Sequence, residues 1–502
     1  MRSGSTRRSS RTGMAPHHAA PRVVVSTRPG AKMVAGWSSH RSESSVRRLL
    51  LLFVAALAAT ALVAPSAVAQ RGDDDDGPTL EESEPEAKPR RTEDYKDTLE
   101  AAIDSIQGYW EVEFEELYGD EYEPIPEERI FAARPGVKLP KCQGTTLTYE
   151  DARENAFYCY EDNFIAYDDV NLFPRLHRDF GELAVPLVMA HEWGHGIQDR
   201  AENEFEADVL KELQADCFAG SWIGFVASEG DPEFDLRGGN LDRAIAAILE
   251  FRDPVGTSAD EQGAHGSGFD RVASLQEGFE SGPDACARYF ENPPVIVEIP
   301  FSDEADAASG GNLPADEVIP AAVETLNDFY TQVEPLYVPK TLDDVYSYDS
   351  SDEDNLPECG GTEQPQSVVR NRVFYCIDDG NFGFDEPYLQ RIYDEIGDFG
   401  VITLFANPFA TYVQTLQGFP GVEENADNAV LGADCYTGGY SAALFNRVLL
   451  VDPVSGEPKY ILSPGDLDES IQAFIDYTGA RGVAADLDAT FLRVRAFRDG
   501  FL

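Results

Sequence analysis

The sequence predicts an α+β fold that is present twice in tandem. Segments with a helical period of apolar residues alternate with segments expected to form short strands, and several short motifs recur in the same order in the two halves. At 502 residues the chain is longer than one core of usual size, so two domains are expected. We place the first domain at 92–300 and the second at 315–502.

The recurring motifs align the two halves. AFYCYEDNFIAYDD around Cys159 matches VFYCIDDGNFGFDE around Cys376, and ELQADCFAG, which begins at Glu212, matches VLGADCYTG, which begins at Val430. RVASLQEGF at 271–279 matches RVRAFRDGF at 493–501. Because the matches keep their order at nearly equal spacing, they indicate a duplicated domain.

The segment 1–69 is expected to be a secretory signal peptide with an extended N-terminus. Arg47 and Arg48 precede an apolar core, and the small residues AVA before Gln70 are typical of a cleavage site. The alternative is an uncleaved anchor, but the apolar core is shorter than the ~20 residues that a spanning helix needs. The acidic segment 70–91 has almost no aliphatic residues and is expected to be a disordered linker.

The charge of the mature chain restricts its partners. Residues 1–69 contain ten of the 39 Lys and Arg and one of the 91 Asp and Glu, which leaves 39 − 10 = 29 bases and 91 − 1 = 90 acids, a net charge of 29 − 90 = −61. Such a surface repels nucleic acid and anionic lipid. We therefore expect no nucleic-acid partner and no stable membrane insertion after signal cleavage, and the oligomeric state stays open.

Each domain is expected to begin with a helix and short strands and to continue with helices. In the first domain the opening helix is placed at 95–117 and the strands near 129–133 and 157–167. A pair of helices at 183–200 and 206–227 follows, and two more helices are placed at 242–251 and 269–280.

HEWGHGIQ, at 191–198, lies in the first helix of this pair. Residues four apart share a helix face, so His191 and His195 can offer ring nitrogens to one ion, with Glu192 beside it. Pro186 falls in the first turn, where proline is tolerated, and Gly194 marks close approach by another backbone. Two histidines are too few ligands for a catalytic zinc, so a third ligand is required.

The next helix supplies the expected third ligand. Glu212 and Asp216 lie four apart on it, and an antiparallel helix pair would bring Glu212 opposite the histidines. Asp216 would accept the N–H of one imidazole and fix its tautomer. The competing acids lie in or near the connecting turn and are expected to be solvated: Glu202, Glu204 and Glu206.

The second domain lacks the ion-binding side chains. The positions that align with His191, Glu192, His195 and Glu212 hold Asn407, Pro408, Thr411 and Val430. A proline inside a helix costs ~3 kcal/mol, so Pro408 is expected to begin or kink its helix. We therefore expect a degenerate second copy and one zinc ion per chain.

The seven cysteines are expected to form three disulfides and to leave one thiol free. Equivalent loops predict the pairs Cys142–Cys159 and Cys359–Cys376, and Cys217 has a mate in Cys286. Cys435 is expected to be a free, buried thiol, because the second copy stops at Leu502, short of the position that matches Cys286.

The motifs resemble those of a known enzyme group. HExxH followed by a helix bearing Glu-x-x-x-Asp resembles the gluzincin metallopeptidases, and HEWGHGIQ with ELQADCFAGSW is similar to the bacterial putative neutral zinc metallopeptidase family. The resemblance extends to FYCYED upstream and to HGSGFDRV and GFESG downstream, so it covers nearly all of the first domain. It implies a zincin-like fold with His191, His195 and Glu212 as zinc ligands, and Glu192 as the base toward a zinc-activated water.

Two further histidines have open roles. His265, in the Gly/Ser-rich stretch AHGSG, either lines the cleft and polarises a substrate carbonyl as a catalytic residue or makes a loop hydrogen bond. His177 is expected at the surface or at a helix cap.

Three functions remain in competition at this stage. The first is a secreted, extracytoplasmic zinc metallopeptidase of a bacterium that acts on a peptide or protein substrate, with cell-wall association open. The second is a non-catalytic binding or scaffold protein on a peptidase fold. The third is a zinc hydrolase of a non-peptide amide or ester.

Overall fold

The computed structural model describes residues 22–24, 95–160, 162–229, 233–234, 236, 239–333, 345–418, 426–478 and 489–502. The described residues of 95–502, together with 22–24, belong to one compact unit. The expected signal peptide and acidic linker thus lie outside the described residues, except for strand β1 (Arg22–Val24). β1 pairs antiparallel with β7 (Ile296–Glu298), and cleavage before Gln70 would remove it.

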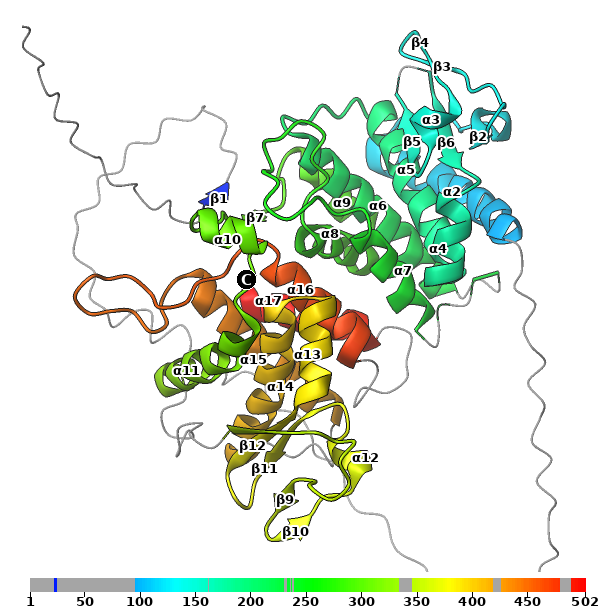
Figure 1. Cartoon of the computed structure of the whole chain (residues 1–502). Coiled ribbons are helices and arrows are strands. Elements are labelled where there is room, and N and C mark those ends of the chain that lie inside the picture. The colour runs from blue at the N-terminus through cyan, green and yellow to red at the C-terminus, as the bar shows by residue number, and fades with distance from the viewer. Residues whose placement is uncertain are drawn as a thin grey trace, which may run out of the picture. The chain divides into compact units, whose positions relative to one another are not determined.

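The first half of the described chain has the mixed α+β character that the sequence predicts (Figure 1). The helix bounds agree with the expected ones to within a few residues. The helical elements, in order, are α2 (Tyr95–Tyr118), η1 (Glu127–Arg129), α3 (Tyr149–Ala152), α4 (Leu172–Phe180), α5 (Ala184–Arg200), α6 (Asp208–Glu229), α7 (Asn240–Leu249), α8 (Gly268–Ser281), α9 (Pro283–Ala287) and η2 (Arg288–Phe290).

A three-stranded sheet accompanies these helices. β6 (Phe164–Asp168) is central, with β2 (Ile130–Ala133) parallel to it on one side and β5 (Ala156–Cys159) antiparallel to it on the other. β3 (Lys141–Cys142) and β4 (Thr145–Thr146) form a separate small hairpin. The range 157–167, expected to be extended throughout, is divided between β5 and β6 by a turn in which Asn163 adopts a φ of 47°.

The second half follows the same order of elements. Its sheet, β8 (Val345–Tyr348), β12 (Asn381–Asp385) and β11 (Val373–Cys376), has the order β8-β12-β11, which corresponds to β2-β6-β5. Its other elements are α11 (Ala315–Val333), β9 (Glu358–Cys359), β10 (Thr362–Glu363), α12 (Gln366–Val369), α13 (Glu386–Glu395), α14 (Asp398–Leu416), α15 (Ala426–Phe445), α16 (Asp466–Ala473), η3 (Phe474–Thr478) and α17 (Ala489–Phe501). α10 (Glu304–Ser309) connects the two halves.

Helix α5 lies at the centre of the first half, against α2, α6 and β5. Almost every residue of α5 is buried, and Pro186 lies in its first turn as expected. At Gly194 the backbones of α5 and α6 come close together: a Cβ added there would lie 2.9 Å from Cα of Ala215. The expected close approach at Gly194 is therefore present. In the second half Pro408 lies inside α14, so of the two expected possibilities, that it begins its helix or that it kinks it, the first is excluded.

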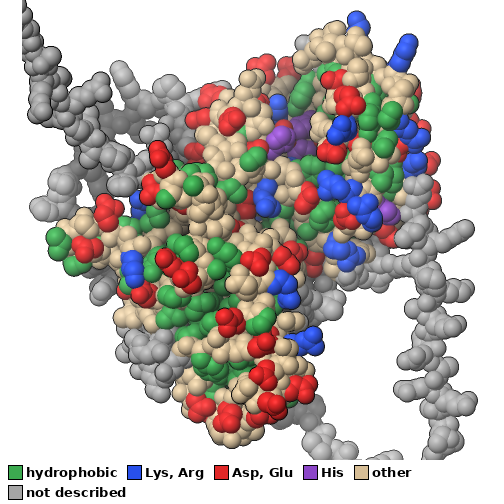
Figure 2. All heavy atoms as spheres, in the orientation of Figure 1, with side chains coloured by type: hydrophobic (Ala, Val, Ile, Leu, Met, Phe, Trp, Pro, Cys, Tyr) green, Lys and Arg blue, Asp and Glu red, His purple; other side chains and the backbone are tan. Residues whose placement is uncertain are grey.

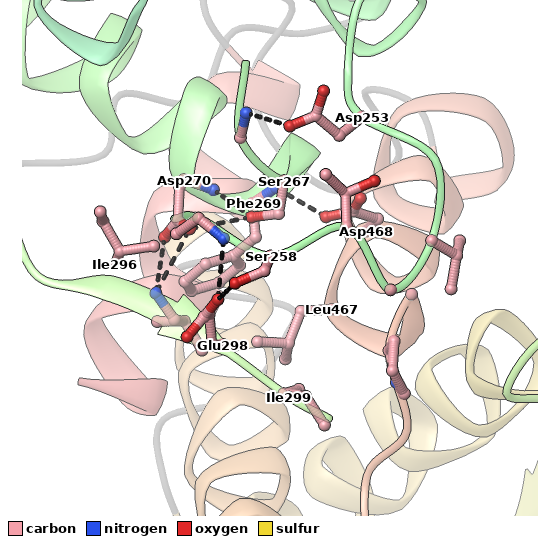
Figure 3. Close-up of a pocket in the computed structure, with 18 of the residues that line it drawn as sticks. Asp253, Ser258, Ser267, Phe269, Asp270, Ile296, Glu298, Ile299, Leu467 and Asp468 are labelled. Carbon is pink, nitrogen blue, oxygen red and sulfur yellow. Dashed lines mark hydrogen bonds between the residues drawn. The ribbon is translucent and has the colours of Figure 1, made fainter. Parts of the chain in front are cut away.

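Helix α8 connects the first half to the second. Backbone N–H groups of Gly268 and Phe269, at the start of α8, donate to the carboxylate of Asp468 at 3.0 and 2.8 Å (Figure 3). Further along α8, the side chain of Gln276 donates to the carbonyl of Phe491 at 2.8 Å. A carboxylate is a strong acceptor for the free N–H groups of a helix N-terminus, so Asp468 caps a helix of the other half.

The structure contains the three disulfides that the sequence predicts: Cys142–Cys159, Cys217–Cys286 and Cys359–Cys376. Cys435 is free, as expected, but it is exposed, so its predicted burial is wrong. The physical reason for the different exposure of Cys217 and Cys435 is whether another helix packs over the cysteine. In the first half α9 carries Cys286 over Cys217, whereas among the described residues no such helix covers Cys435.

None of the helices in the described ranges combines the length and the apolar character that crossing a membrane requires.

Candidate metal centre

The candidate metal centre is formed by the consecutive helices α5 and α6. On α5, His191, Glu192 and His195 each expose 7% of their surface. Because α5 is packed on several sides, these polar residues lie inside the molecule and not on a solvated helix face. The close contact at Gly194 brings α6 near enough for Glu212 to reach both imidazoles.

The distances between the donor atoms fit a zinc ion. Oε2 of Glu212 lies 3.2 Å from Nε2 of His191 and 3.5 Å from Nε2 of His195. The ligand atoms of the three residues all lie within 4.8 Å of one another. Ligands placed about 2.0–2.1 Å from a tetrahedral zinc are separated by about 3.3 Å, so this set could hold zinc and leave a fourth position open.

Each imidazole is oriented by a partner at its other nitrogen. Nδ1 of His191 donates to Oδ1 of Asp216 at 2.8 Å, as expected from the sequence. Asp216 in turn accepts two hydrogen bonds of 2.8 Å from the guanidinium of Arg271, and both side chains are fully buried. Such a partner fixes the tautomer, so Nε2 of His191 is left free to face Glu212.

His195 has a different pair of partners. Its Nδ1 lies 2.9 Å from Oε1 of Gln198, one helical turn further along α5, and 3.1 Å from the hydroxyl of Tyr160. Gln198 is itself held by a hydrogen bond from its amide to the carbonyl of Lys211 on α6. The orientation of His195 therefore also depends on the packing of α5 against α6.

Charge interactions inside the site are strong because the groups are buried. Burial lowers the pKa of His191, but the carboxylates of Asp216 and Glu212 outweigh burial and raise it to about 10. Burial raises the pKa of Glu212, and the two histidines outweigh this effect and hold it well below its usual value. A metal that binds His191 must displace a proton, so its affinity falls at low pH.

Glu192 lines the same cavity without belonging to the group of ligand atoms. Burial raises the pKa of its carboxyl, while the charges of His191 and His195 lower it. A carboxyl with a raised pKa takes up a proton more readily than an ordinary glutamate, which suits a general base beside a candidate metal site.

The site opens into a cavity of about 220 Å³. The edge strand β5 forms one side of it, and α5, α6, α7 and the region around His265 form the rest. On the face that Figure 2 shows, histidine side chains are visible in a hollow of the surface. The lining outside the metal centre combines aromatic and aliphatic side chains with charged ones: Phe157, Tyr158, Tyr160, Val188, Lys211, Ile248, Phe251, His265 and Arg271.

The position of His265 is compatible with both expected roles, a side chain that lines the cavity and a residue that makes a loop hydrogen bond. It lines the cavity, and its backbone N–H donates to Asp253 at 2.8 Å while its Nδ1 lies 3.4 Å from the same carboxylate. Its side chain is 51% exposed. His177 lies on α4, half-buried near Tyr95.

The competing acids of the first half stay away from the centre. Those in the segment between α5 and α6 are exposed: Glu202, Glu204 and Glu206.

The aligned position in the second half has the same buried Asp–Arg pair but lacks the candidate metal ligands. Asp434 accepts two hydrogen bonds of 2.8 Å from Arg493, as Asp216 does from Arg271. Asn407, which aligns with His191, donates to Asp434 at 2.6 Å. Among the described residues, Asp434 belongs to no group of three or more His, Cys, Asp or Glu side chains whose ligand atoms lie close enough together to hold a metal ion.

Sequence reasoning missed three residues that orient the histidines: Tyr160, Gln198 and Arg271. A signal for two of them was present. Gln198 lies one turn after His195 inside HEWGHGIQ, and Arg271 recurs as Arg493 in the aligned motif. Tyr160 has no such signal, because its contact with His195 depends on how β5 packs against α5.

An α+β fold that joins an HExxH motif to a glutamate of the following helix is the arrangement of HExxH zinc peptidases. Comparison with known families agrees with it. A profile of the family described as "Putative neutral zinc metallopeptidase" matches residues 24–290, more than half of the chain. The chain belongs to this family.

The curated relatives are uncharacterized proteins. One of Mycobacterium bovis and one of Mycobacterium tuberculosis strain H37Rv are each 30% identical over 181 residues, and YpfJ of Escherichia coli K12 is 30% identical over 182 residues. Each match covers 30% of this chain and 61% of the relative, so the chain spans less than two thirds of these proteins. No solved structure matches the chain.

Proposed function

We propose that the protein is an exported zinc-dependent peptidase. His191, His195 and Glu212 hold the zinc, and Glu192 is the general base. The observation that carries the proposal is the convergence of two imidazole Nε2 atoms and one carboxylate oxygen at 3.2 and 3.5 Å, in a buried cavity that Glu192 also lines. Family membership supports the same conclusion.

The residues of the chain divide the work. Zinc bound here would polarise a substrate carbonyl and lower the pKa of a bound water to ~7. Glu192 accepts the proton of the attacking water and delivers it to the leaving nitrogen. Asp216 and Gln198 hold the imidazoles with Nε2 toward Glu212. The edge strand β5 and the apolar side chains of the cavity offer a surface to a peptide or protein substrate.

The second half is proposed to be a degenerate copy of the first, with domains at 92–300 and 315–502. The matching order of elements, the matching sheet order and the repeated Asp–Arg pair support this origin. The copy lacks the ligands, so we propose one zinc per chain and a scaffold role for the second domain.

Export is proposed from the signal-like segment 1–69. The three disulfides support it, because disulfides persist in oxidising compartments. The acidic surface supports the proposed absence of nucleic-acid partners; Figure 2 shows acidic side chains gathered over the end that carries α12 and β9 to β12.

The test is a comparison of the wild-type protein with Glu192→Gln. The variant keeps the shape of the side chain, so we expect it to retain one zinc per chain and to lose ~10²–10⁴-fold in kcat. Zinc is measured by elemental analysis, and cleavage is measured on casein and a peptide library. Glu202→Gln is the matched control, because the same change falls on an exposed residue.

Each other outcome is informative. Undiminished cleavage by Glu192→Gln would refute the assignment of the base. Zinc binding by the wild type without cleavage of any peptide would favour a non-catalytic binding protein. Hydrolysis of non-peptide amides or esters alone would favour a zinc hydrolase of non-peptide substrates.

A further inference from the structure

Three carboxylates meet in the second half, apart from the candidate metal centre. Asp398 is the first residue of α14, and Asp466 and Glu469 lie in the first turn of α16. One oxygen from each lies within 4.8 Å of the others. Asp398 and Asp466 each expose only 3% of their surface, so this group differs from the many solvated acids on the protein.

The backbone holds each carboxylate through one oxygen. Oδ2 of Asp398 accepts the N–H of Leu313 at 3.0 Å, and Oδ2 of Asp466 accepts the N–H of Ser463 at 2.9 Å. Oε2 of Glu469 accepts the N–H of Phe399 at 2.8 Å. These bonds fix the three groups in place from outside the cluster.

The remaining aspartate oxygens lack partners. Oδ1 of Asp398 and Oδ1 of Asp466 are buried and receive no hydrogen bond from any described residue. A buried polar atom without a partner costs on the order of 1–3 kcal/mol, more when it is charged. Two such atoms in one cluster, both on nine-tenths buried side chains, point to a bound ligand that supplies positive charge.

No described Lys, Arg or His pairs with any of the three carboxylates, although Arg252 pairs with the neighbouring Asp468. Burial and the neighbouring carboxylates raise the pKa of Glu469 to about 8 and that of Asp398 to about 6. Buried charges of one sign must be neutralised by a proton or by a cation.

The aligned place in the first half contains a base. NLDRAIAAIL in α7 aligns with DLDESIQA in α16, so Arg243 aligns with Glu469. Each lies beside a glycine that precedes the paired helix: a Cβ added at Gly181 would contact Nε of Arg243, and a Cβ added at Gly397 would contact the carboxylate of Glu469. The second half thus has an acidic side chain, Glu469, where the first half has the positively charged Arg243.

A cavity of about 700 Å³ leads to the cluster. Asp398, Asp466 and Ser463 line it, together with Asp306 and Asn312. This space can admit an ion with its water ligands, and it offers further oxygen atoms for coordination.

We propose that Asp398, Asp466 and Glu469 bind a Ca²⁺ ion that ties the start of α14 to α16. The donors are all oxygens, which suit hard cations and not zinc. Ca²⁺ accepts 6–8 oxygen ligands in flexible geometry, so three carboxylates and waters from the cavity can complete its shell. The site is independent of the zinc site and of the proposed peptidase activity.

The test uses the full mature chain after removal of divalent ions with EGTA, followed by titration with CaCl₂ in a calorimeter and by thermal unfolding. We expect one Ca²⁺ per chain and a Tm that rises with Ca²⁺ concentration. Asp466→Asn should weaken binding at least tenfold and abolish the Tm shift. Asp394→Asn, which removes an exposed acid of α13, is the control and should bind Ca²⁺ as the wild type does.

A second measurement covers the case in which Asp466→Asn fails to fold. Tb³⁺, a luminescent substitute for Ca²⁺, should be sensitised by Tyr440, which lines the cavity, and Ca²⁺ should displace it from the wild type. The absence of Ca²⁺ binding and of a Tm shift at millimolar Ca²⁺ would overturn the proposal and leave protons as the neutralising charge. Binding of Mg²⁺ in preference to Ca²⁺ would overturn the choice of ion.

Discussion

At the residue scale, Asp216 joins two other side chains, His191 and Arg271, in one buried cluster. It accepts from His191 on one side and from Arg271 on the other, at 2.8 Å each, and each of the three residues exposes 7% of its surface or less. Burial raises the pKa of Asp216, and the charges of Arg271 and His191 outweigh burial and lower it. Asp216 therefore serves both the stability of the fold and the orientation of the imidazole.

These two roles can be separated by a pair of variants. Asp216→Asn and Asp434→Asn each break a buried Asp–Arg pair, so each should lower the free energy of unfolding by about 3–5 kcal/mol. Only Asp216→Asn should also lower zinc affinity, by about 10–100-fold, because Asp434 orients no histidine. Chemical denaturation and competition with a zinc chelator measure the two effects. Equal zinc affinities in the two variants would contradict the orienting role.

The sequence was sufficient to predict that the three candidate ligands lie together, but not to predict most of the residues that orient them. The spacing of four residues places His191 and His195 on one helix face wherever that helix lies in the fold. The contacts of Tyr160 and Arg271 join elements far apart in the chain, so only the packed structure determines them. The burial of Cys435 was predicted wrongly for the same reason, since the cover over a helix is a tertiary property.

At the scale of elements, the contact between α5 and α6 determines the geometry of the candidate metal centre. The candidate ligands come from both helices, and at Gly194 the backbones approach so closely that an added Cβ would lie 2.9 Å from Cα of Ala215. A side chain at this position would push the helices apart and lengthen the distance from Glu212 to the imidazoles.

Gly194→Ala should therefore destabilise the protein and weaken zinc binding together. We expect a loss of about 1–3 kcal/mol from overpacking, with a lower zinc affinity. Gly108→Ala is the control, because Gly108 lies inside α2 with no atom within 4 Å of an added Cβ. It should be neutral or stabilising by about 0.5–1 kcal/mol. Stability is measured from unfolding curves, and zinc affinity from competition with a chelator, on both variants. A Gly194→Ala protein with unchanged stability and zinc affinity would contradict the tight contact between α5 and α6.

The start of α8 contains a group that should make stability depend on pH. Asp270 is buried next to the cap residue Ser267 and accepts the N–H of Val297 (Figure 3). Burial raises its pKa from the usual 3.8 to about 7. Between these two values the folded chain holds a proton that the unfolded chain has released, so stability falls as pH rises from about 4 to 7.

Asp270→Asn removes this titration. The difference in unfolding free energy between pH 5 and pH 8 should be smaller in the variant than in the wild type, by an amount on the order of a few kcal/mol. Urea unfolding at both pH values provides the measurement. An identical pH dependence in the two proteins would show that Asp270 does not titrate in this range.

The helices of the fold followed from the sequence more closely than the strands did. Apolar residues spaced by three and four predicted the helices at 183–200 and 206–227, and α5 and α6 begin and end within two residues of these bounds. The β5–β6 hairpin was expected as one extended range, because the aromatic alternation continues across the turn and the left-handed residue is Asn163 instead of a glycine.

At the scale of the whole molecule, the second half supports the first at α8. Asp468 caps α8, and Gln276 of α8 bonds both the carbonyl of Phe491 and the side chain of Arg498. α8 also carries Arg271, which holds Asp216. Helix α8 thus links the second half to the candidate metal centre.

A chain that ends at residue 300 should consequently be less stable than the intact protein. It would expose the buried face of α8 and leave Gln276 and the N-terminal N–H groups without partners, at about 1–3 kcal/mol for each group that stays buried. We expect a lower Tm and weaker zinc binding, measured by calorimetry and elemental analysis. An isolated first domain with unchanged Tm would show that the second domain has another role.

The buried pair Asp434–Arg493 makes the second half a place where a metal site could be built. Asp434 already accepts hydrogen bonds from Arg493 and from Asn407, as Asp216 accepts one from His191. Substituting Asn407→His, Thr411→His and Val430→Glu would add the three candidate ligands beside this Asp–Arg pair, while Pro408 would still lie where the first half has Glu192. Under the proposed function, such a redesigned chain would bind two metal ions while only its first half cleaved peptide bonds, so that metal binding and catalysis could be measured separately in one polypeptide.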